Sequence, residues 1–197
     1  MKPKIILVGG GGHCISCIDV IEQEGRFQIA GIVDANKIGD QVLGYPVLGG
    51  DDELPSLRKT YEYALVTIGQ IKTPLTRMKL YEQLALLTFN LPSIISPRAY
   101  VSKSAVISDG SIIMHDALIN AQAEIGNNCI INTKALIEHN SKIGSHCHIS
   151  TGAIINGGVK VGHGAFVGSN AVVRELAQIN ENFFVRSGDL FSGVGDE

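Results

Sequence analysis

Hydrophobic residues recur at every sixth position through the second half of the chain. Isoleucine or valine fills these positions from Ile95 to Ile179, and the residue four places after each, from Ala99 to Ala177, is small except at Val159. An unbroken six-residue period is typical of a parallel β-helix with one short strand per hexad. Branched side chains would fill its interior and small ones its corners, so three hexads form one triangular coil. We therefore predict about five coils, on the order of 24 Å tall at roughly 4.8 Å per strand layer.

The first ninety residues show a different pattern, in which apolar runs alternate with helical spacing. The pattern predicts strands at residues 4–8, 27–33, 45–48 and 63–68, and helices at 14–23, 51–59 and 73–87. Alternating strands and helices indicate a parallel sheet, so the expected class is α/β plus β, a Rossmann-like domain followed by the β-helix. We divide the chain into a nucleotide-sugar-binding domain at 1–92, a catalytic β-helix at 93–182 and a C-terminal tail at 183–197.

Composition and charge narrow the classes of partner. The chain has 197 residues, 45% of them hydrophobic and 18% charged, which is enough to bury a sizeable core without disulfides or metal. A net charge of −3 gives no basic field, so neither nucleic acid nor a membrane surface is an expected partner. No segment approaches the roughly 20 apolar residues of a membrane span, and the apolar run at 5–8 is too short for a signal peptide. We expect a soluble, cytoplasmic protein.

The four cysteines are best explained by packing. Cys129 and Cys147 fall eighteen residues apart in the column of small residues, where they would fill the core of the β-helix. Cys14 and Cys17 form a Cys-x-x-Cys pair at the start of a predicted helix, which is also the placement of thioredoxin-like redox sites. The cytoplasmic expectation argues against disulfides, and a redox pair remains the alternative to two small residues facing the sheet.

A glycine loop, Gly9 to Gly12 followed by His13, joins the first strand to the first helix. Glycines at this junction let the backbone approach a phosphate at the positive end of the helix. Asp34 ends the next strand, where a ribose-binding acid would lie. The third glycine of a dinucleotide fingerprint would fall at Ile15, so a mononucleotide or nucleotide sugar fits better than NAD. A tight turn without a ligand is the alternative.

Five of the six histidines lie in the hexad array. His115, His139 and His163 share one hexad position but project from three different corners, so they cannot converge on one metal within a chain. A zinc site shared between chains, as in γ-class carbonic anhydrases, remains an alternative. His139 stands out because Ala121 and Gly157 lie one coil below and above it, which leaves space for a ligand.

Polar residues surround His139 in the sequence. Glu138 and Asn140 flank it, and Asn132 lies one side earlier on the coil. These groups offer hydrogen bonds that would fix the tautomer of the imidazole. A neutral imidazole held in this way suits a general base that takes a proton from an attacking amine or hydroxyl.

Taken together, these motifs resemble a known family. They are Gly11-Gly12-His13, Asp34, Ile68-Gly69, Asn132-Thr133, Ile137-Glu138-His139, His148 and Gly152-Ala153. Over roughly residues 3–175 the chain resembles the bacterial acetyltransferases of the bacillosamine and sialic-acid pathways, the PglD and NeuD type. The resemblance implies a left-handed β-helix, a homotrimer, acetyl-CoA in the groove between prisms, a nucleotide sugar on the N-terminal domain, and no metal.

The resemblance also implies roles for single residues at the acyl-transfer centre. His139 matches the general base, and Asn132 matches a polar residue near the acceptor amine. His148 matches a contact to the pantetheine arm, and Gly157 a backbone contact to the thioester region. The implied reaction is direct attack of the 4-amino group of a UDP-type amino-deoxy sugar on the thioester, with a backbone N–H stabilising the oxyanion.

On the N-terminal domain, the resemblance places Gly11, Gly12 and His13 against the sugar and phosphates. It places Asp34 near the nucleoside, and Gly69 belongs to the same substrate-binding set.

Two departures from the family pattern affect these expectations. Asn140 stands where the family commonly has an acid, so we expect any carboxylate to come from Glu138 or a neighbouring subunit. The tail lacks the Gly-x-Pro-Ala-Lys ending found near the CoA nucleotide, which leaves Lys160 and Arg186 as expected CoA contacts.

Two alternatives to N-acetylation stay open on the sequence. One is O-acetylation of sialic or legionaminic acid in the same groove. The other is a non-catalytic, trimeric nucleotide-sugar-binding protein whose acetyltransferase site has decayed.

Overall fold

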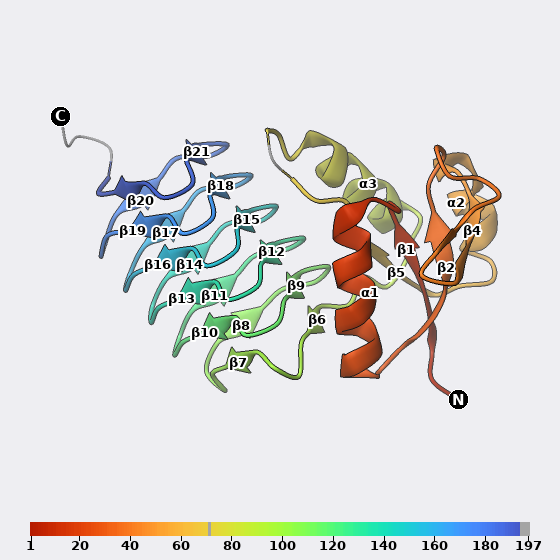
Figure 1. Ribbon diagram of the computed structural model, residues 1–197, viewed down its shortest axis with the longest axis horizontal. Coiled ribbons are helices and arrows are strands. Elements are labelled where there is room, and N and C mark those ends of the chain that lie inside the picture. Colours follow the sequence, from red (N-terminus) through yellow and green to blue (C-terminus); the bar gives the residue numbers. More distant parts are fainter. Residues whose placement is uncertain (71, 194–197) are drawn as a thin grey trace.

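The computed structural model describes residues 1–70 and 72–193 as an α/β part beside a three-sided β-helix (Figure 1). The last residues of the predicted tail, 194–197, lie outside the described residues. Among the residues described, no helix is long and apolar enough to cross a membrane.

The α/β part contains a five-stranded sheet in the order β3-β4-β2-β1-β5, parallel except for the β3–β4 pair. Its strands are β1 (Lys4–Val8), β2 (Gln28–Val33), β3 (Gln41–Val42), β4 (Tyr45–Gly49) and β5 (Tyr63–Val66). Its helices are α1 (Gly12–Glu24), α2 (Leu54–Leu57), which follows a 3-10 turn (Asp51–Glu53), and α3 (Leu75–Leu86). The predicted strands and long helices are confirmed, whereas the helix expected at 51–59 is only these two short turns.

The β-helix is built from three sheets of short parallel strands. The docked sheet contains β6 (Ile94–Ile95), β9 (Ile112–Ile113), β12 (Ile130–Ile131), β15 (His148–Ile149), β18 (Phe166–Val167) and β21 (Phe184–Val185). The apolar sheet contains β7 (Tyr100–Val101), β10 (Leu118–Ile119), β13 (Leu136–Ile137), β16 (Ile154–Ile155), β19 (Val172–Val173) and β22 (Leu190–Phe191). The charged sheet contains β8 (Val106–Ile107), β11 (Glu124–Ile125), β14 (Lys142–Ile143), β17 (Lys160–Val161) and β20 (Gln178–Ile179).

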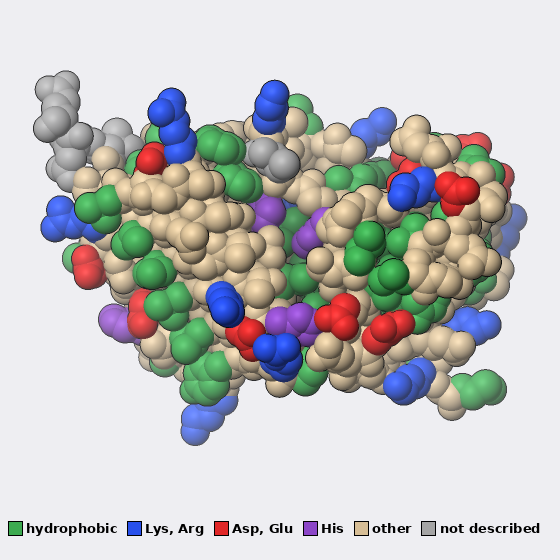
Figure 2. All heavy atoms as spheres, viewed as in Figure 1, with side chains coloured by type: hydrophobic (Ala, Val, Ile, Leu, Met, Phe, Trp, Pro, Cys, Tyr) green, Lys and Arg blue, Asp and Glu red, His purple; other side chains and the backbone are tan. Residues whose placement is uncertain are grey.

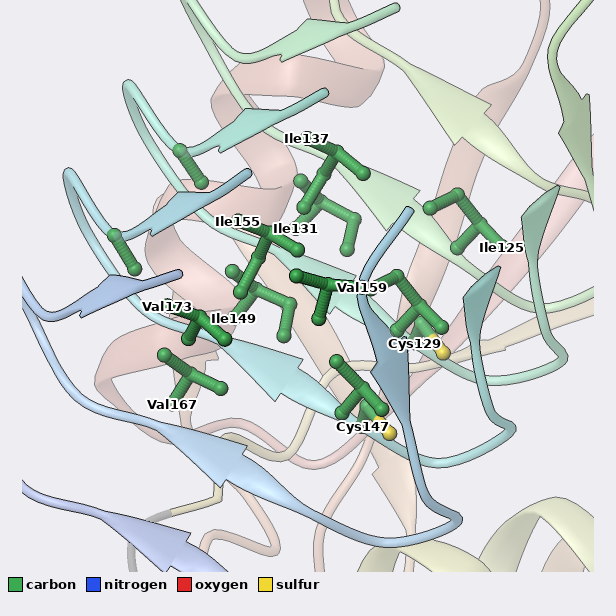
Figure 3. Close-up of a cluster of buried hydrophobic side chains, with 14 of the residues drawn as sticks. Ile125, Cys129, Ile131, Ile137, Cys147, Ile149, Ile155, Val159, Val167 and Val173 are labelled. Carbon is green, nitrogen blue, oxygen red and sulfur yellow. The ribbon is translucent and has the colours of Figure 1, made fainter. Parts of the chain in front are cut away.

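Residues eighteen apart pair directly from coil to coil, as Leu118 does with Leu136. The second residue of each strand points inward, and Figure 3 shows Ile131, Ile149 and Val167 packed in the interior. The small-residue column fills the corners, and even its exception, Val159, is fully buried. All four cysteines are buried with free thiols, in agreement with the packing interpretation.

Helix α1 joins the two parts, because it packs against the sheet and against the docked sheet of the β-helix at once. Its buried residues, among them Cys17 and Ile18, share one hydrophobic cluster with Ile94, Ile112 and Ile130. The docked sheet is therefore the surface that fixes the α/β part to the prism.

The expected end of the β-helix at residue 182 is too early. Strands β21 and β22 continue the docked and apolar sheets, and the six-residue period continues through Val185 and Phe191. The sequence obscured this continuation because Phe183 takes a place that is small in earlier hexads. Phe183 is 41% exposed on the last coil, where its bulk need not fit into a corner.

Strand β14 provides a test of the inward and outward assignment. Ile143→Ala should lower the free energy of unfolding by about 2–5 kcal/mol, because it leaves a cavity in the prism. Lys142→Ala, the outward neighbour, should cost less than about 1 kcal/mol, since it removes only an exposed ion pair with Glu124. Urea unfolding measures both variants, and equal losses would contradict the assignment.

Candidate functional site

A cavity of about 580 Å³ lies where the α/β part meets the β-helix. We call it the glycine-loop cavity; it is lined by Gly9, Gly11, Gly12, His13, Asp34, Thr67, Ile68, Gly69, Gln70, Asn132 and His148. In Figure 2, histidine side chains gather in the hollow between the two parts. Every residue predicted to bind the nucleotide sugar lies in this one cavity, together with two residues predicted for catalysis or CoA.

The local fold of the glycine loop explains its sequence. Gly9 has φ +105°, and a Cβ there would lie 2.2 Å from the Ile68 side chain, so only glycine fits. The Thr67 hydroxyl donates to the Gly9 carbonyl oxygen over 2.7 Å and fixes the turn. Helix α1 begins at Gly12, so its first backbone N–H groups are available at the cavity for an anion.

Asp34 braces this loop. Its Oδ2 accepts the backbone N–H of Gly10 over 2.8 Å, and its Oδ1 accepts that of Asn36 over 2.9 Å. Both carboxylate oxygens therefore have backbone partners in the chain. Asp34 has a structural role beside the nucleoside contact that the sequence predicts.

Two histidines line the cavity in the neutral state. Burial, with the nearby Arg77 charge, lowers the pKa of His13 to about 4, and burial lowers the pKa of His148 to about 3. Their ring centroids are 6.4 Å apart. Within the described residues, His13 Nε2 is buried without a hydrogen-bond partner.

His148 has a defined tautomer. Its Nδ1 lies 2.8 Å from the Gln70 carbonyl oxygen, which can only accept, so Nδ1 carries the hydrogen. Its Nε2 is then an acceptor for the Asn132 side-chain amide at 3.1 Å. Asn132 Oδ1 accepts the backbone N–H of Thr133 over 2.8 Å.

A second cavity, of about 520 Å³, surrounds the predicted general base. We call it the His139 cavity; it is lined by Glu138, His139, Asn140, Asn156, Gly157, Gly158, Glu175 and Leu176. A Cβ at Gly157 would lie 2.9 Å from two atoms of the His139 ring. The space expected above His139 is thus filled by the imidazole ring itself. The room for a ligand is in the cavity beside the ring.

Glu138 and Asn132 do not form the hydrogen bonds to the His139 ring that the sequence predicts. Glu138 Oε2 accepts from the Asn120 amide over 2.8 Å and from the His139 backbone N–H over 3.2 Å. Asn132 points into the other cavity. Within residues 1–70 and 72–193, no hydrogen bond reaches the ring nitrogens of His139.

The apolar sheet separates the two cavities. Asn132 follows β12 at the corner between the docked and apolar sheets, and His139 follows β13 at the corner between the apolar and charged sheets. The outward residues of the apolar sheet are exposed or half-buried in the single chain; they are Tyr100, Leu118, Leu136, Ile154, Val172 and Leu190.

The predicted CoA contacts are dispersed. His148 lines the glycine-loop cavity, and Gly157 lies next to the His139 ring, one coil further along the prism. Lys160 lines a third cavity on the charged sheet with Lys142 and does not line either of the first two. Among the described residues no group of three His, Cys, Asp or Glu side chains could hold a metal ion.

Sequence reasoning missed several residues of the site. Gln70 lines the glycine-loop cavity, and Glu175 lines the His139 cavity. On α3, the charged residue Arg77 is 1% exposed, whereas the apolar residue Leu75 is 66% exposed, which a hydrophobic pattern does not predict. Only for Glu175 did the sequence carry a signal, because it lies eighteen residues after Gly157.

Comparison with known proteins identifies the class. Two family models match the chain: the PglD N-terminal domain at residues 4–84 and the GMPPB C-terminal domain at residues 94–192. None of the curated protein sequences matches.

Several solved structures are similar over nearly the whole chain. PerB from Caulobacter crescentus, in complex with CoA and GDP-perosamine, is 33% identical with a TM-score of 0.91, covering 100% of this chain and 93% of that one. A variant of perosamine N-acetyltransferase from the same organism is 34% identical with a TM-score of 0.89, covering 95% and 88%. The acetyltransferase domain of PglB from Neisseria gonorrhoeae, in complex with acetyl coenzyme A, is 28% identical with a TM-score of 0.91, covering 98% and 92%.

The fold and the similar structures define a left-handed β-helix acetyltransferase with a Rossmann-like N-terminal domain. Within this class, the chain belongs to the PglD-type bacterial sugar acetyltransferases. The predicted fold class, the acetyltransferase assignment and acetyl-CoA as donor are confirmed.

The two neutral histidines predict a pH dependence of stability. Above an ordinary pKa of 6.5, His13 and His148 are neutral in both states; below it, the unfolded chain binds protons that the folded chain does not. Stability should therefore fall as pH drops from 6.5 toward the folded values, by up to about 1.4 kcal/mol per pH unit for each histidine. Urea midpoints at pH 7.5, 6.5 and 5.5 measure this. His148→Gln should reduce the slope, and an unchanged midpoint down to pH 5.5 would contradict the prediction.

Proposed function

We propose that the chain transfers an acetyl group from acetyl-CoA to the 4-amino group of a nucleotide-linked amino-deoxy sugar, with His139 as general base. The observation that carries the proposal is the glycine-loop cavity, in which a helix N-terminus, a glycine turn and two neutral histidines line one space. Backbone N–H groups at a helix N-terminus suit a diphosphate. The Caulobacter structure, which holds CoA and GDP-perosamine, supports a nucleotide amino sugar as acceptor.

The chemistry requires one proton acceptor at the amine. The sugar nitrogen attacks the thioester carbonyl carbon, a C–N bond forms, and the nitrogen loses a proton to His139. Collapse of the tetrahedral species breaks the C–S bond, and His139 returns the proton to the departing sulfur of CoA. No covalent acyl-enzyme forms in this scheme. An exposed imidazole next to Gly157, facing a cavity of about 520 Å³, suits this role.

The proposal also specifies which nucleotide carries the sugar. We favour a UDP-linked sugar, as the resemblance to the PglD type implies. A GDP-linked sugar is the alternative substrate to test, because one similar structure holds GDP-perosamine.

We also propose a homotrimer, because one chain keeps the two cavities on opposite edges of the apolar sheet. Three copies with their apolar sheets toward a common axis would cover the exposed column that runs from Tyr100 to Leu190. Each head-to-tail contact would bring the docked–apolar corner of one copy to the apolar–charged corner of the next. His139 of one subunit would then face the glycine-loop cavity of its neighbour, where Asn132 lies.

The general-base assignment predicts a loss of turnover. His139→Ala should lower kcat by about 10²- to 10⁴-fold with UDP- or GDP-linked 4-amino-4,6-dideoxy sugars, because the amine loses its proton acceptor. The assay follows thiol release from acetyl-CoA. His163→Ala is the matched control, since His163 has the same hexad position at another corner and lines neither cavity. Full activity of His139→Ala would remove the assignment, and no turnover by the unaltered protein on any sugar would favour a binding protein.

The shared site predicts complementation between two inactive variants. Gly11 has an ordinary extended backbone and open space at its Cβ, so Gly11→Phe should fold and block the glycine-loop cavity. Co-expressed in equal amounts with His139→Ala, it should restore about a quarter of wild-type activity, since random mixed trimers carry one intact site each. Activity of each variant alone is the control. No recovery from trimers shown to be mixed would contradict a site built from two chains.

A further inference from the structure

Arg77 on α3 is a buried cation for which the described residues provide no carboxylate. Its guanidinium donates to the backbone carbonyl oxygens of Asn128 and His146, at equivalent corners of successive coils, and to Oε1 of Gln70. Its Nε is buried and has no partner among the described residues. Burying a charge is unfavourable unless its partners offset the loss of hydration. An arginine in this position therefore needs an explanation beyond filling space.

Gln70 carries the contact of Arg77 toward the glycine-loop cavity. The Gln70 side chain is held at both ends, because Oε1 accepts from Arg77 over 2.6 Å and Nε2 donates to the Gly164 carbonyl oxygen over 3.1 Å. The Gln70 backbone oxygen accepts the Nδ1–H of His148 over 2.8 Å. One residue, Gln70, thus links Arg77 to the ring of His148.

The tautomer of His148 determines whether the Asn132 side chain presents a hydrogen-bond donor to the cavity. With Nδ1 protonated, Nε2 accepts one hydrogen of the Asn132 amide, and Asn132 Oδ1 is already used by Thr133. Among the described residues the second hydrogen of that amide has no partner, so it is available to a ligand. In the other tautomer Nε2 would donate, and Asn132 would have to turn its oxygen toward His148 and release Thr133.

We propose that Arg77 is a positioning residue for the glycine-loop cavity. Acting through Gln70, it keeps His148 as the Nδ1–H tautomer and so keeps the Asn132 amide as a hydrogen-bond donor to the substrate. The ligand group that fits this donor is a hydroxyl, carbonyl or phosphate oxygen of the bound nucleotide sugar. The substrate half of the inference rests on the proposed function, whereas the tautomer half does not.

A purely structural role for Arg77 makes a different prediction. The arginine also ties α3 to two coils of the β-helix, and loss of those bonds alone would lower stability. It would leave the protonation of His148 in the folded protein unchanged. The tautomer of His148 is therefore the measurement that separates the two roles.

The test uses Arg77→Met, which keeps the length of the side chain, and Gln70→Ala, which cuts the relay but leaves Arg77 its two carbonyl partners. Lys79→Met is the control, because Lys79 is exposed on the same helix. In protein without ligand, long-range nitrogen–proton NMR reads the His148 ring, assigned with His148→Gln. We expect a single Nδ1–H pattern in the wild type and Lys79→Met, and a mixture of tautomers in Arg77→Met and Gln70→Ala.

Kinetics test the substrate half with the same variants. The KM for the nucleotide sugar should rise about ten-fold in Arg77→Met and Gln70→Ala, with kcat within about three-fold, because loss of a supporting hydrogen bond weakens binding rather than the chemical step. An unchanged tautomer in the folded variants would overturn the proposal, as would a lost tautomer with an unchanged KM. If Arg77→Met does not fold, Gln70→Ala decides. If the wild type acetylates no sugar, the proposed function fails. The NMR result still tests whether Arg77, through Gln70, sets the tautomer of His148.

Discussion

Coil-to-coil stacking is the constraint on which the rest of the molecule depends. Each strand residue pairs with the residue eighteen places later, so every position of the hexad becomes a continuous column along the prism. On the docked sheet the outward column begins with Ile94, Ile112 and Ile130, which α1 covers. It then reaches His148, which lines the glycine-loop cavity. The column thus changes from an interdomain contact to a cavity wall within one coil.

The cavity obtains its polarity from the backbone and from neutral rings. The Asp34 carboxylate is bonded to two backbone N–H groups, and burial keeps His13 and His148 uncharged at neutral pH. The buried cation, Arg77, lies behind Gln70 and does not line the cavity. A diphosphate there would be recognised by directed N–H groups at the start of α1, which favour anions without a fixed ionic partner.

The sequence predicted those features that follow from a period or a local turn. The hexads specified the interior and the corner columns, and the glycine loop with Asp34 specified one end of the sheet, where the carboxyl ends of β1 and β2 meet. It did not predict contacts between distant segments. The bond from Gln70 to Gly164 joins residues 94 positions apart, and no period relates them.

The expected hydrogen bond from Asn132 to the His139 ring within one chain was wrong, and the hexads could have prevented this error. Asn132 directly follows the inward-facing residue Ile131. His139 lies two places after the next inward-facing residue, Ile137, so Asn132 and His139 belong to different corners. Nearness in sequence was taken for nearness in space. Within one chain, the apolar sheet lies between them.

Asn140 illustrates how backbone geometry can explain an apparent loss of function. The resemblance leads one to expect an acid after His139, and its replacement by an amide suggested a decayed site. Asn140 has φ +61°, in the left-handed region, as do Asn128, Asn170 and Asn182 at other corners. Asparagine adopts this region more readily than most residues. The amide therefore has a conformational reason to be there, and Glu175 is an acidic residue that lines the same cavity.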